Sequence, residues 1–335
     1  MSDAAAAGAT AVVVAATAVD SLASPLDAAA AAVAHAARLA LALPAPPAVL
    51  CILSVRDLPP AGRRAATWRP LARALAALYV AAARESFAAG APLLPVDVVL
   101  DGACGYNVWD FAAERRQVAA LVVAGPHAPP ALATASFLPG NTVAPVVVGA
   151  PSVPAEPASD GGGADEMHQG AFAHVAVGGT FDHMHAGHRI LLTITAWLAT
   201  ERIVCGVVDF DPARLRRKAA FEAMEPLDQR LAAVRSFLHQ VRRDVVHDVV
   251  PIHDDLGPTR DDPAIEALVG SAETAAGCAM VNKIRAEGGL SQLRLFIIDV
   301  ITSSADAATT LDFSAKISSS YLRKHILDSR VGQPQ

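Results

Sequence analysis

The sequence has no long apolar run and no excess of basic residues, and each absence excludes a class of protein. Its most apolar region, 27–55, is interrupted by Asp27, His35, Arg38 and several prolines, so it falls short of the ~20 apolar residues that a membrane-spanning helix needs. The 33 acidic residues outnumber the 27 basic ones, and the net charge of −6 disfavours broad binding to nucleic acid or to anionic membranes. We therefore expect a soluble protein with neither kind of partner, in which a local cluster of donors binds any anionic ligand.

Cysteine is also scarce. The four cysteines lie far apart in the sequence and form no C-x-x-C pair, which argues against a disulfide framework and a structural zinc site and favours a reducing compartment. No Lys or Arg precedes Arg38, so the beginning of the sequence resembles neither a secretory signal nor an Arg-rich transit peptide. The expected localisation is cytoplasmic.

The two commonest nucleotide-binding loops are missing. The chain contains no G-x-x-x-x-G-K-[ST] motif, and no G-x-G-x-x-G motif follows a predicted strand of the first half. One segment of this half, Asp101–Tyr106, follows a strand, and we interpret it as a tight turn that uses Gly102 and Gly105. The residues of the first half therefore assign it no function.

A stretch rich in proline, glycine and small polar residues, Pro151–Gly170, separates two halves of similar size. It has no apolar periodicity, which is typical of a flexible linker. We predict an accessory α/β domain of unknown function over 1–150, a linker over 151–171 and a second domain over 172–330.

Both halves alternate short apolar runs with helix-length segments, a pattern typical of α/β layers built on a mostly parallel sheet. For the second half we predict a doubly wound, Rossmann-like sheet that binds ligands at the carboxyl ends of its strands. The predicted strands are Ala11–Ala16, Val49–Val55, Val96–Leu100, Ala119–Ala124, Val143–Val148, His174–Val177, Arg202–Val208, Val245–Pro251, Ile265–Val269 and Leu293–Val300, and the predicted helices are Pro25–Leu43, Ala65–Ala88 and segments that begin near His185, Pro226, Glu273 and Ser319.

The loop after the strand at 174–177 carries the strongest signal for chemistry. It reads GGTFDHMHAGH, Gly178–His188, and we expect its two glycines to let the backbone turn sharply and approach a ligand. His185 and His188 are one helical turn apart, so on a helix that starts here they face the same way, above free N–H groups that attract phosphate. His183 is out of phase and is predicted to face solvent. A single histidine is more often an ordinary residue, but the whole unit favours nucleotide chemistry.

The loop after the next strand, Asp209–Phe221, contains four basic residues. We interpret Arg214 and Arg216 as a solvated face. Lys218 differs because it precedes an apolar pair and follows a strand, so its ammonium group is predicted to reach the crevice as a point charge.

Three serines open the amphipathic segment Lys316–Leu327 near the end of the chain. Helix capping explains one serine well, but it does not explain three in a row. Together with Arg323, one turn further on, the serines predict a second phosphate-binding helix terminus.

These motifs in combination, GGTF-x-x-x-H-x-x-H and S-S-x-x-x-R, resemble the nucleotidyltransferase superfamily with the H-x-G-H signature. That group transfers a nucleoside monophosphate from a nucleoside triphosphate to a phosphate or carboxylate and releases pyrophosphate. Three further segments are similar to the eukaryotic and archaeal phosphopantetheine adenylyltransferases: the Lys218 loop with Glu225–Arg230, Pro251–Thr274 and Gly277–Arg285. The resemblance covers about 172–327. The R-T-x-G-I-S-T-type segment of cytidylyltransferases is missing, and the missing P-loop implies a single activity without a fused kinase.

The resemblance implies a role for individual residues in the transfer of AMP from ATP to 4′-phosphopantetheine. His188 would donate to the α-phosphate, Thr180 would touch both substrates, and Lys218 would orient the incoming phosphate. Arg230 is either a second substrate contact or a partner in an ion pair on the helix surface. The implied ATP-binding set is Gly178, Gly179, Thr180, Phe181, His185, His188, Glu273, Thr274, Asn282, Ser318, Ser319, Ser320 and Arg323; Mg²⁺ would bridge phosphate oxygens without dedicated protein ligands.

Two alternatives stay open. The first is a superfamily relative with another acceptor, such as nicotinamide mononucleotide, or a cytidylyltransferase. The second is a non-catalytic nucleotide-binding scaffold whose first half recruits other coenzyme A enzymes.

Overall fold

The computed structural model describes residues 12–109, 118–124, 146–148, 170–211, 215–298 and 318–331. Its internal contacts divide the chain into two compact units, the first formed by Met1–Leu58 and Ala77–Asp160 and the second by Pro59–Ala76 and Gly161–Gln335. Most of the predicted linker, up to residue 169, lies outside the described residues. Residues 59–76 precede the linker by far, yet they belong to the second unit.

The first unit contains a five-stranded parallel sheet in the order β3-β2-β1-β4-β5. β1 and β2 are buried along nearly their whole length, as expected of strands covered on both faces. The turn predicted at Asp101–Tyr106 is confirmed, with φ of +79° at Gly102 and +77° at Gly105. The elements that begin in the first half are β1 (Val12–Val19), α1 (Asp27–Leu41), β2 (Ala48–Val55), a 3-10 helix (Ala61–Thr67), α2 (Trp68–Ala88), β3 (Val96–Asp101), β4 (Val118–Ala124) and β5 (Val146–Val148).

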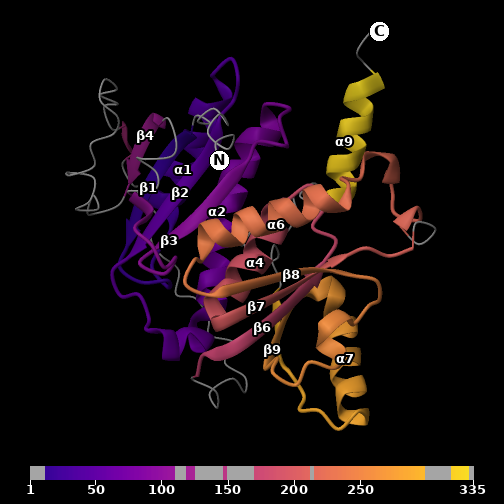
Figure 1. The fold of residues 1–335 in the computed structure, drawn as a ribbon. Coiled ribbons are helices and arrows are strands. Elements are labelled where there is room, and N and C mark those ends of the chain that lie inside the picture. The colour runs from indigo at the N-terminus through magenta and orange to yellow at the C-terminus, as the bar shows by residue number, and fades with distance from the viewer. Residues whose placement is uncertain are drawn as a thin grey trace, which may run out of the picture. The chain divides into compact units, whose positions relative to one another are not determined.

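The second unit also contains a five-stranded parallel sheet, in the order β10-β9-β6-β7-β8. Strands β6 to β9 of this sheet are labelled in Figure 1. The predicted doubly wound α/β fold is therefore confirmed. The strand order reverses between β6 and β9, and ligands of such sheets bind where the carboxyl ends of these two strands diverge. Its elements are β6 (Phe172–Gly179), α4 (Ala186–Leu198), β7 (Ala199–Val208), α6 (Leu227–Val241), β8 (Val246–Ile252), β9 (Ala267–Ser271), α7 (Ala275–Glu287), β10 (Arg294–Ile298) and α9 (Ser319–Val331), with short 3-10 helices at Phe221–Ala223, Gly257–Arg260 and Ala272–Thr274.

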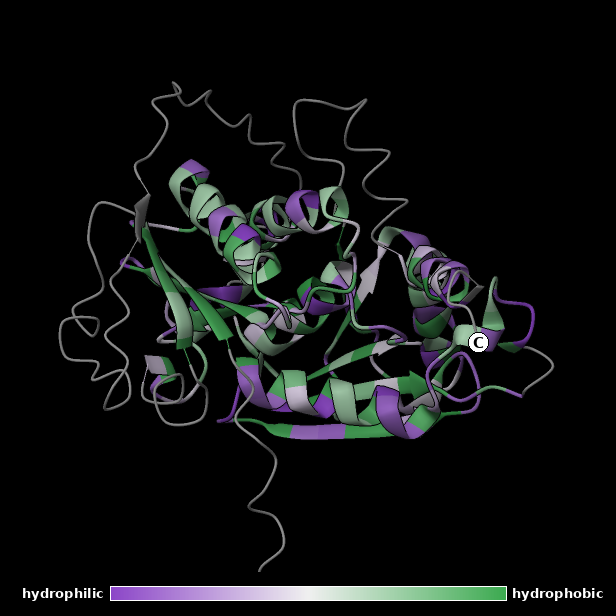
Figure 2. Cartoon of the chain, turned by 90° about the horizontal axis from the view of Figure 1, so that it is seen from above, coloured by the Kyte–Doolittle hydropathy of each residue, from purple (hydrophilic) through white to green (hydrophobic). Residues whose placement is uncertain are grey.

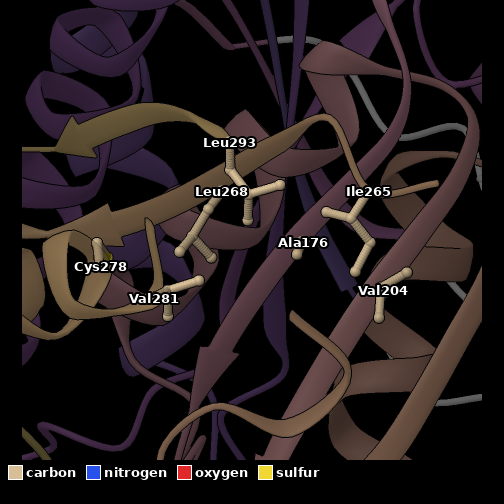
Figure 3. Packing of buried hydrophobic residues seen from close by; sticks show 7 residues of the cluster. All are labelled: Ala176, Val204, Ile265, Leu268, Cys278, Val281 and Leu293. Atoms are coloured by element: carbon tan, nitrogen blue, oxygen red, sulfur yellow. The ribbon is translucent and has the colours of Figure 1, made fainter. Parts of the chain in front are cut away.

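An apolar cluster holds α7 against the second sheet. Cys278 and Val281 of α7 pack onto side chains of the sheet and its adjoining segments, among them Leu268 of β9 (Figure 3). The strands are coloured mostly as hydrophobic in Figure 2, whereas most helices mix hydrophobic and hydrophilic residues. α4 differs, because all of its residues from Ile190 to Leu198 are buried. No helix among the described residues is both long and apolar enough to cross a membrane.

Residues 59–76 complete the core of the second unit. The indole N–H of Trp197 on α4 donates to the carbonyl oxygen of Arg64 over 2.9 Å, and the Arg64 guanidinium lies 4.8 Å from the Trp197 ring centre. Trp68 meets Phe296 of β10 edge to face, with ring centres 5.7 Å apart. Local sequence patterns could not predict these contacts, because the two residues in each contact are more than a hundred positions apart in the chain.

A close approach between β9 and α7 makes Gly270 a sensitive position. A Cβ atom there would lie 2.5 Å from Cys278 Sγ and 3.1 Å from Thr274 Oγ1. We expect Gly270→Ala to lower the free energy of unfolding by about 1–3 kcal/mol through overpacking. Gly277→Ala is the matched control: it adds the same methyl group on exposed α7 where no atom lies within 4 Å, so it should raise stability by roughly 0.5–1 kcal/mol. Urea unfolding of both variants measures the difference; equal effects would contradict the packing described.

Candidate active site at the carboxyl edge of the second sheet

The chain turns sharply after β6, but not at the glycines predicted to make the turn. Gly178 and Gly179 are the last residues of β6, and the residues with positive φ are Phe181 (50°) and His183 (46°). The expectation of a glycine turn is therefore wrong. Gly179 serves a different purpose: a Cβ on it would lie 3.2 Å from the fully buried Phe181 ring, so glycine makes room for that ring.

His185 and His188 lie on the same face at the start of α4, as their spacing predicts. Their rings are stacked with centres 3.8 Å apart. Gly187 permits this stacking, because a Cβ there would come within 3.1 Å of the His185 ring. His185 occupies the N-cap position and no side chain caps the helix, so the first-turn N–H groups have no side-chain acceptor. The Nδ1 atom of each histidine is buried without a hydrogen-bond partner.

Both imidazoles are neutral near pH 7. Burial, followed by the charges of Arg189 and His183, lowers the pKa of His185 to about 3. Burial lowers the pKa of His188 well below its usual value, and His185, Arg189 and Lys218 lower it further. A neutral imidazole both donates and accepts a hydrogen bond, so the pair is suited to bind phosphate oxygens through N–H groups.

These lowered pKa values predict an acid-sensitive fold. Below the unfolded-state pKa of about 6.5 the unfolded chain binds protons that the folded chain excludes, so stability is present above that pH and is lost as pH falls. Because the residue as a whole is half-buried, the effect is moderate. When the pH falls from roughly 7 to 5.5, we expect the His185→Gln variant to lose about 1 kcal/mol less stability than wild type loses. Urea unfolding at both pH values tests this. Equal losses in the two proteins would contradict the assignment.

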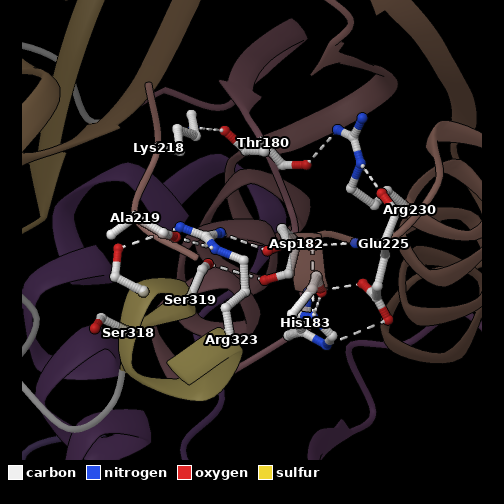
Figure 4. A network of polar contacts seen from close by, with 12 residues as sticks. Thr180, Asp182, His183, Lys218, Ala219, Glu225, Arg230, Ser318, Ser319 and Arg323 are labelled. Atoms are coloured by element: carbon white, nitrogen blue, oxygen red, sulfur yellow. Dashed lines mark hydrogen bonds and ion pairs between the residues drawn. The ribbon is translucent and has the colours of Figure 1, made fainter. Parts of the chain in front are cut away.

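Lys218 reaches the loop after β6, as predicted for a basic residue at this edge. Its Nζ donates to Thr180 Oγ1 over 2.5 Å (Figure 4). Arg216, in the same loop, is exposed as predicted, and Arg214 lies outside the described residues. Arg230 is 2 % exposed and its Nη1 donates to the carbonyl oxygens of Thr180 and Val208, each over 2.8 Å.

Two expectations for this region are corrected. Arg230 is not an ion-pair partner on the helix surface, because its guanidinium is buried and donates to main-chain oxygens, including that of Glu225. A contact of Arg230 with substrate stays a prediction. His183 does not face solvent: its side chain is 13 % exposed, its Nε2 lies 2.7 Å from the Ala223 oxygen, and its main-chain N–H donates to Glu225. Helical phase does not apply to His183, because this residue lies before α4, which begins at Ala186.

The three serines at the start of α9, of which Ser318 precedes the helix, have three different partners. Ser318 Oγ accepts the N–H of Tyr321, Ser319 Oγ donates to the main-chain oxygen of Asp182, and Ser320 Oγ accepts from Arg323. Arg323 is 2 % exposed and forms an ion pair of 2.6 Å with Asp182. The serines and Arg323 therefore lie beside the loop after β6; their binding of phosphate stays a prediction.

Three other predicted residues, which follow β9 or lie on α7, make different contacts. Thr274 and Ser271 form a capping box ahead of α7, and Glu273 is exposed. The amide of Asn282 makes two hydrogen bonds with the main chain of Leu293, just before β10. Among the described residues, no hydrogen bond or ion pair joins these three to Thr180, Lys218 or the histidines. Their contact with nucleotide stays a prediction.

Sequence reasoning missed two acidic residues of the site, Asp182 and Glu225. The Asp182 side chain is fully buried, and Glu225 accepts from the His183 N–H over 2.7 Å. A signal for Asp182 was present in the sequence. An unpaired carboxylate between Phe181 and His183 would repel a polyphosphate, so it needed a cationic partner.

Comparisons with known proteins match the part of the chain that contains this site. The family model described as cytidylyltransferase-like matches residues 176–325. A Pyrobaculum aerophilum protein named phosphopantetheine adenylyltransferase is 34 % identical over 155 residues, which cover 46 % of this chain and 91 % of that protein. The chain belongs to the phosphopantetheine adenylyltransferase family.

Fungal relatives extend the comparison. A Saccharomyces cerevisiae protein named phosphopantetheine adenylyltransferase is 36 % identical over 158 residues, 47 % of this chain and 50 % of the relative. An uncharacterised Schizosaccharomyces pombe protein is 37 % identical over 151 residues, 45 % of this chain and 47 % of the relative. The chain thus spans about half the length of each of these two fungal relatives.

Proposed function

We propose that the chain transfers AMP from ATP to 4′-phosphopantetheine, giving dephospho-CoA and pyrophosphate. The observation that carries the proposal is the stacked, neutral His185–His188 pair at the start of α4, next to Lys218 on Thr180. A helix terminus with free N–H groups, two imidazoles and one ammonium group suits a polyphosphate that reacts with a second phosphate. The names of the archaeal and yeast relatives support the same reaction.

The reaction needs positioning and charge stabilisation rather than a covalent nucleophile. An oxygen of the pantetheine phosphate attacks the α-phosphorus in line as the bond to the pyrophosphate oxygen breaks. His188 donates to an α-phosphate oxygen while negative charge builds there, and His185 binds the neighbouring phosphates. Lys218 neutralises the incoming phosphate, and Thr180, whose hydroxyl already accepts from Lys218, lies between the two reactants.

Magnesium enters this proposal as part of the MgATP substrate, because the ion is commonly held by phosphate oxygens and few protein ligands. The described residues contain no group of three or more His, Cys, Asp or Glu side chains placed to hold a metal ion. The residues that do converge here, neutral imidazoles and cationic groups, fit the phosphate end of MgATP.

The test of acceptor choice is a panel of substrates. Several nucleoside triphosphates are each combined with 4′-phosphopantetheine, nicotinamide mononucleotide and phosphocholine, and the products are separated by chromatography. We expect dephospho-CoA from ATP to be the dominant product. A dominant product with another acceptor would leave a nucleotidyltransferase of different specificity, and tight ATP binding without any product would favour the scaffold alternative.

We further propose that the first unit is accessory to this reaction and that the protein acts in the cytoplasm. The four cysteines are all free and buried, which fits a reducing compartment. Burial raises the pKa of the Cys51 thiol to about 12, so it is a packed, unreactive group.

A further inference from the structure

The loop after β6 contains a buried charge to which the proposed mechanism gives no role. Asp182 is fully buried, and both its carboxylate oxygens are engaged: Oδ2 lies 2.6 Å from Arg323 Nη1, and Oδ1 accepts the N–H of Glu225 over 2.8 Å. Its main-chain oxygen accepts from Ser319. Asp182 thus joins the loop after β6 to α9 and to the turn before α6 (Figure 4).

Arg323 extends this connection to the lysine loop. Its Nε donates over 2.8 Å to the main-chain oxygen of Ala219, the neighbour of Lys218, and its Nη2 donates to Ser320 Oγ over 3.3 Å. One ion pair therefore sets the positions of two separate phosphate-binding segments, the Lys218 loop and the start of α9. Neither segment belongs to the sheet, so neither is held by strand pairing.

The same geometry bears on the role that the resemblance implies for Arg323. Each of its three guanidinium nitrogens already donates to a protein oxygen, and the side chain is 3 % exposed. If Arg323 turned to bind a phosphate, Asp182 would remain as an unpaired buried carboxylate close to a polyanion. Both burial and like charge oppose that state.

We propose that Asp182 is a positioning residue that acts through Arg323 to align Lys218 and the serines at the start of α9, and that Arg323 holds these segments in place rather than binding the β- and γ-phosphates. This proposal rests on the proposed adenylyl transfer. It predicts that the two residues behave as one unit in catalysis, whereas a phosphate ligand and a structural carboxylate would act separately.

The test is a double-mutant cycle of Asp182→Asn, Arg323→Lys and the double variant, assayed for dephospho-CoA formation. Each single change should lower kcat about 10–100-fold, since misplacement of a binding group by ~1 Å has effects of this size. KM for ATP should change by less than about 3-fold. The kcat of the double variant should be no more than about 3-fold below that of the less active single variant. A large rise in KM for ATP in Arg323→Lys, with normal kcat in Asp182→Asn, would overturn the proposal.

Hydrogen exchange supplies a readout that does not depend on turnover. Amides of α9 and of the Lys218 loop should exchange faster in Asp182→Asn and in Arg323→Lys than in wild type. Arg242→Lys is the matched control, because Arg242 is also buried and paired with an aspartate, Asp244, at 2.5 Å, on the opposite edge of the sheet. Arg242→Lys should leave hydrogen exchange in α9 and in the Lys218 loop as it is in wild type. Wild-type exchange of these segments in Asp182→Asn and Arg323→Lys would also contradict the proposal. If Asp182→Asn does not fold, Arg323→Lys alone is compared with wild type, both for kcat against KM for ATP and for hydrogen exchange.

Wild type is the reference in every assay. Wild type that forms no dephospho-CoA contradicts the proposed function. Wild-type turnover with additive losses in the cycle contradicts only the positioning role.

Discussion

His188→Ala is expected to lower kcat about 10²–10³-fold, because a preorganised donor aimed at developing charge is typically worth ~3–4 kcal/mol. The affinity for ATP should change little, since the remaining donors at the α4 terminus and His185 still bind the ground-state phosphates. The neutral state of His188 makes the donation independent of pH near neutrality. The loss should therefore be the same from about pH 7 to pH 8.5.

Steady-state kinetics with saturating 4′-phosphopantetheine measures this loss, and equilibrium binding of ATP measures affinity. His174→Ala is the matched control: His174 lies on the same strand, β6, but at its amino end, where it contacts Arg202. It should retain kcat within about 2-fold, as expected for a residue remote from the developing charge. A folded His188→Ala protein with wild-type kcat would remove this histidine from the mechanism.

Lys218→Ala is expected to lower kcat/KM for 4′-phosphopantetheine about 10–100-fold, since a hydrogen bond to a charged group contributes about 1.5–3 kcal/mol. The reason is electrostatic. The acceptor phosphate and ATP are both anions, and the ammonium group on Thr180 offsets their repulsion. KM for ATP should change less, because the phosphates of ATP retain the α4 terminus and the histidines.

Arg216→Ala is the control for Lys218→Ala, because it removes one positive charge from an exposed position two residues away. If general attraction of anions explained the effect, both variants would lose activity, and both losses would shrink as salt is added. We expect a loss in Lys218→Ala only. A Lys218→Ala protein with normal affinity for 4′-phosphopantetheine and reduced affinity for ATP would contradict the assignment of Lys218 to the acceptor.

Local patterns predicted the scaffold of this site well. The apolar runs placed all ten strands, and the three-residue spacing of His185 and His188 placed both rings on one face of α4. Lys218 was predicted from its place after β7, because loops that follow parallel strands meet at one sheet edge. These predictions succeeded because periodicity and strand polarity are fixed by short stretches of sequence.

The parts that escaped prediction depend on tertiary contacts. Phe181 and His183 adopt positive φ although neither is glycine, and the His183 side chain contacts the main chain of Ala223 instead of facing solvent. Asp182 and Arg323 find each other across 141 residues of sequence. The contribution of residues 59–76 to the second unit likewise joins distant segments, and no local pattern encodes it.

The most direct test of the account is pyrophosphate release from ATP and magnesium by the full chain, measured with and without 4′-phosphopantetheine. Adenylyl transfer at this site predicts pyrophosphate release that requires the acceptor, matches the dephospho-CoA formed, and is lost almost entirely in His188→Ala. Release without the acceptor, or no release in the presence of both substrates, would contradict it.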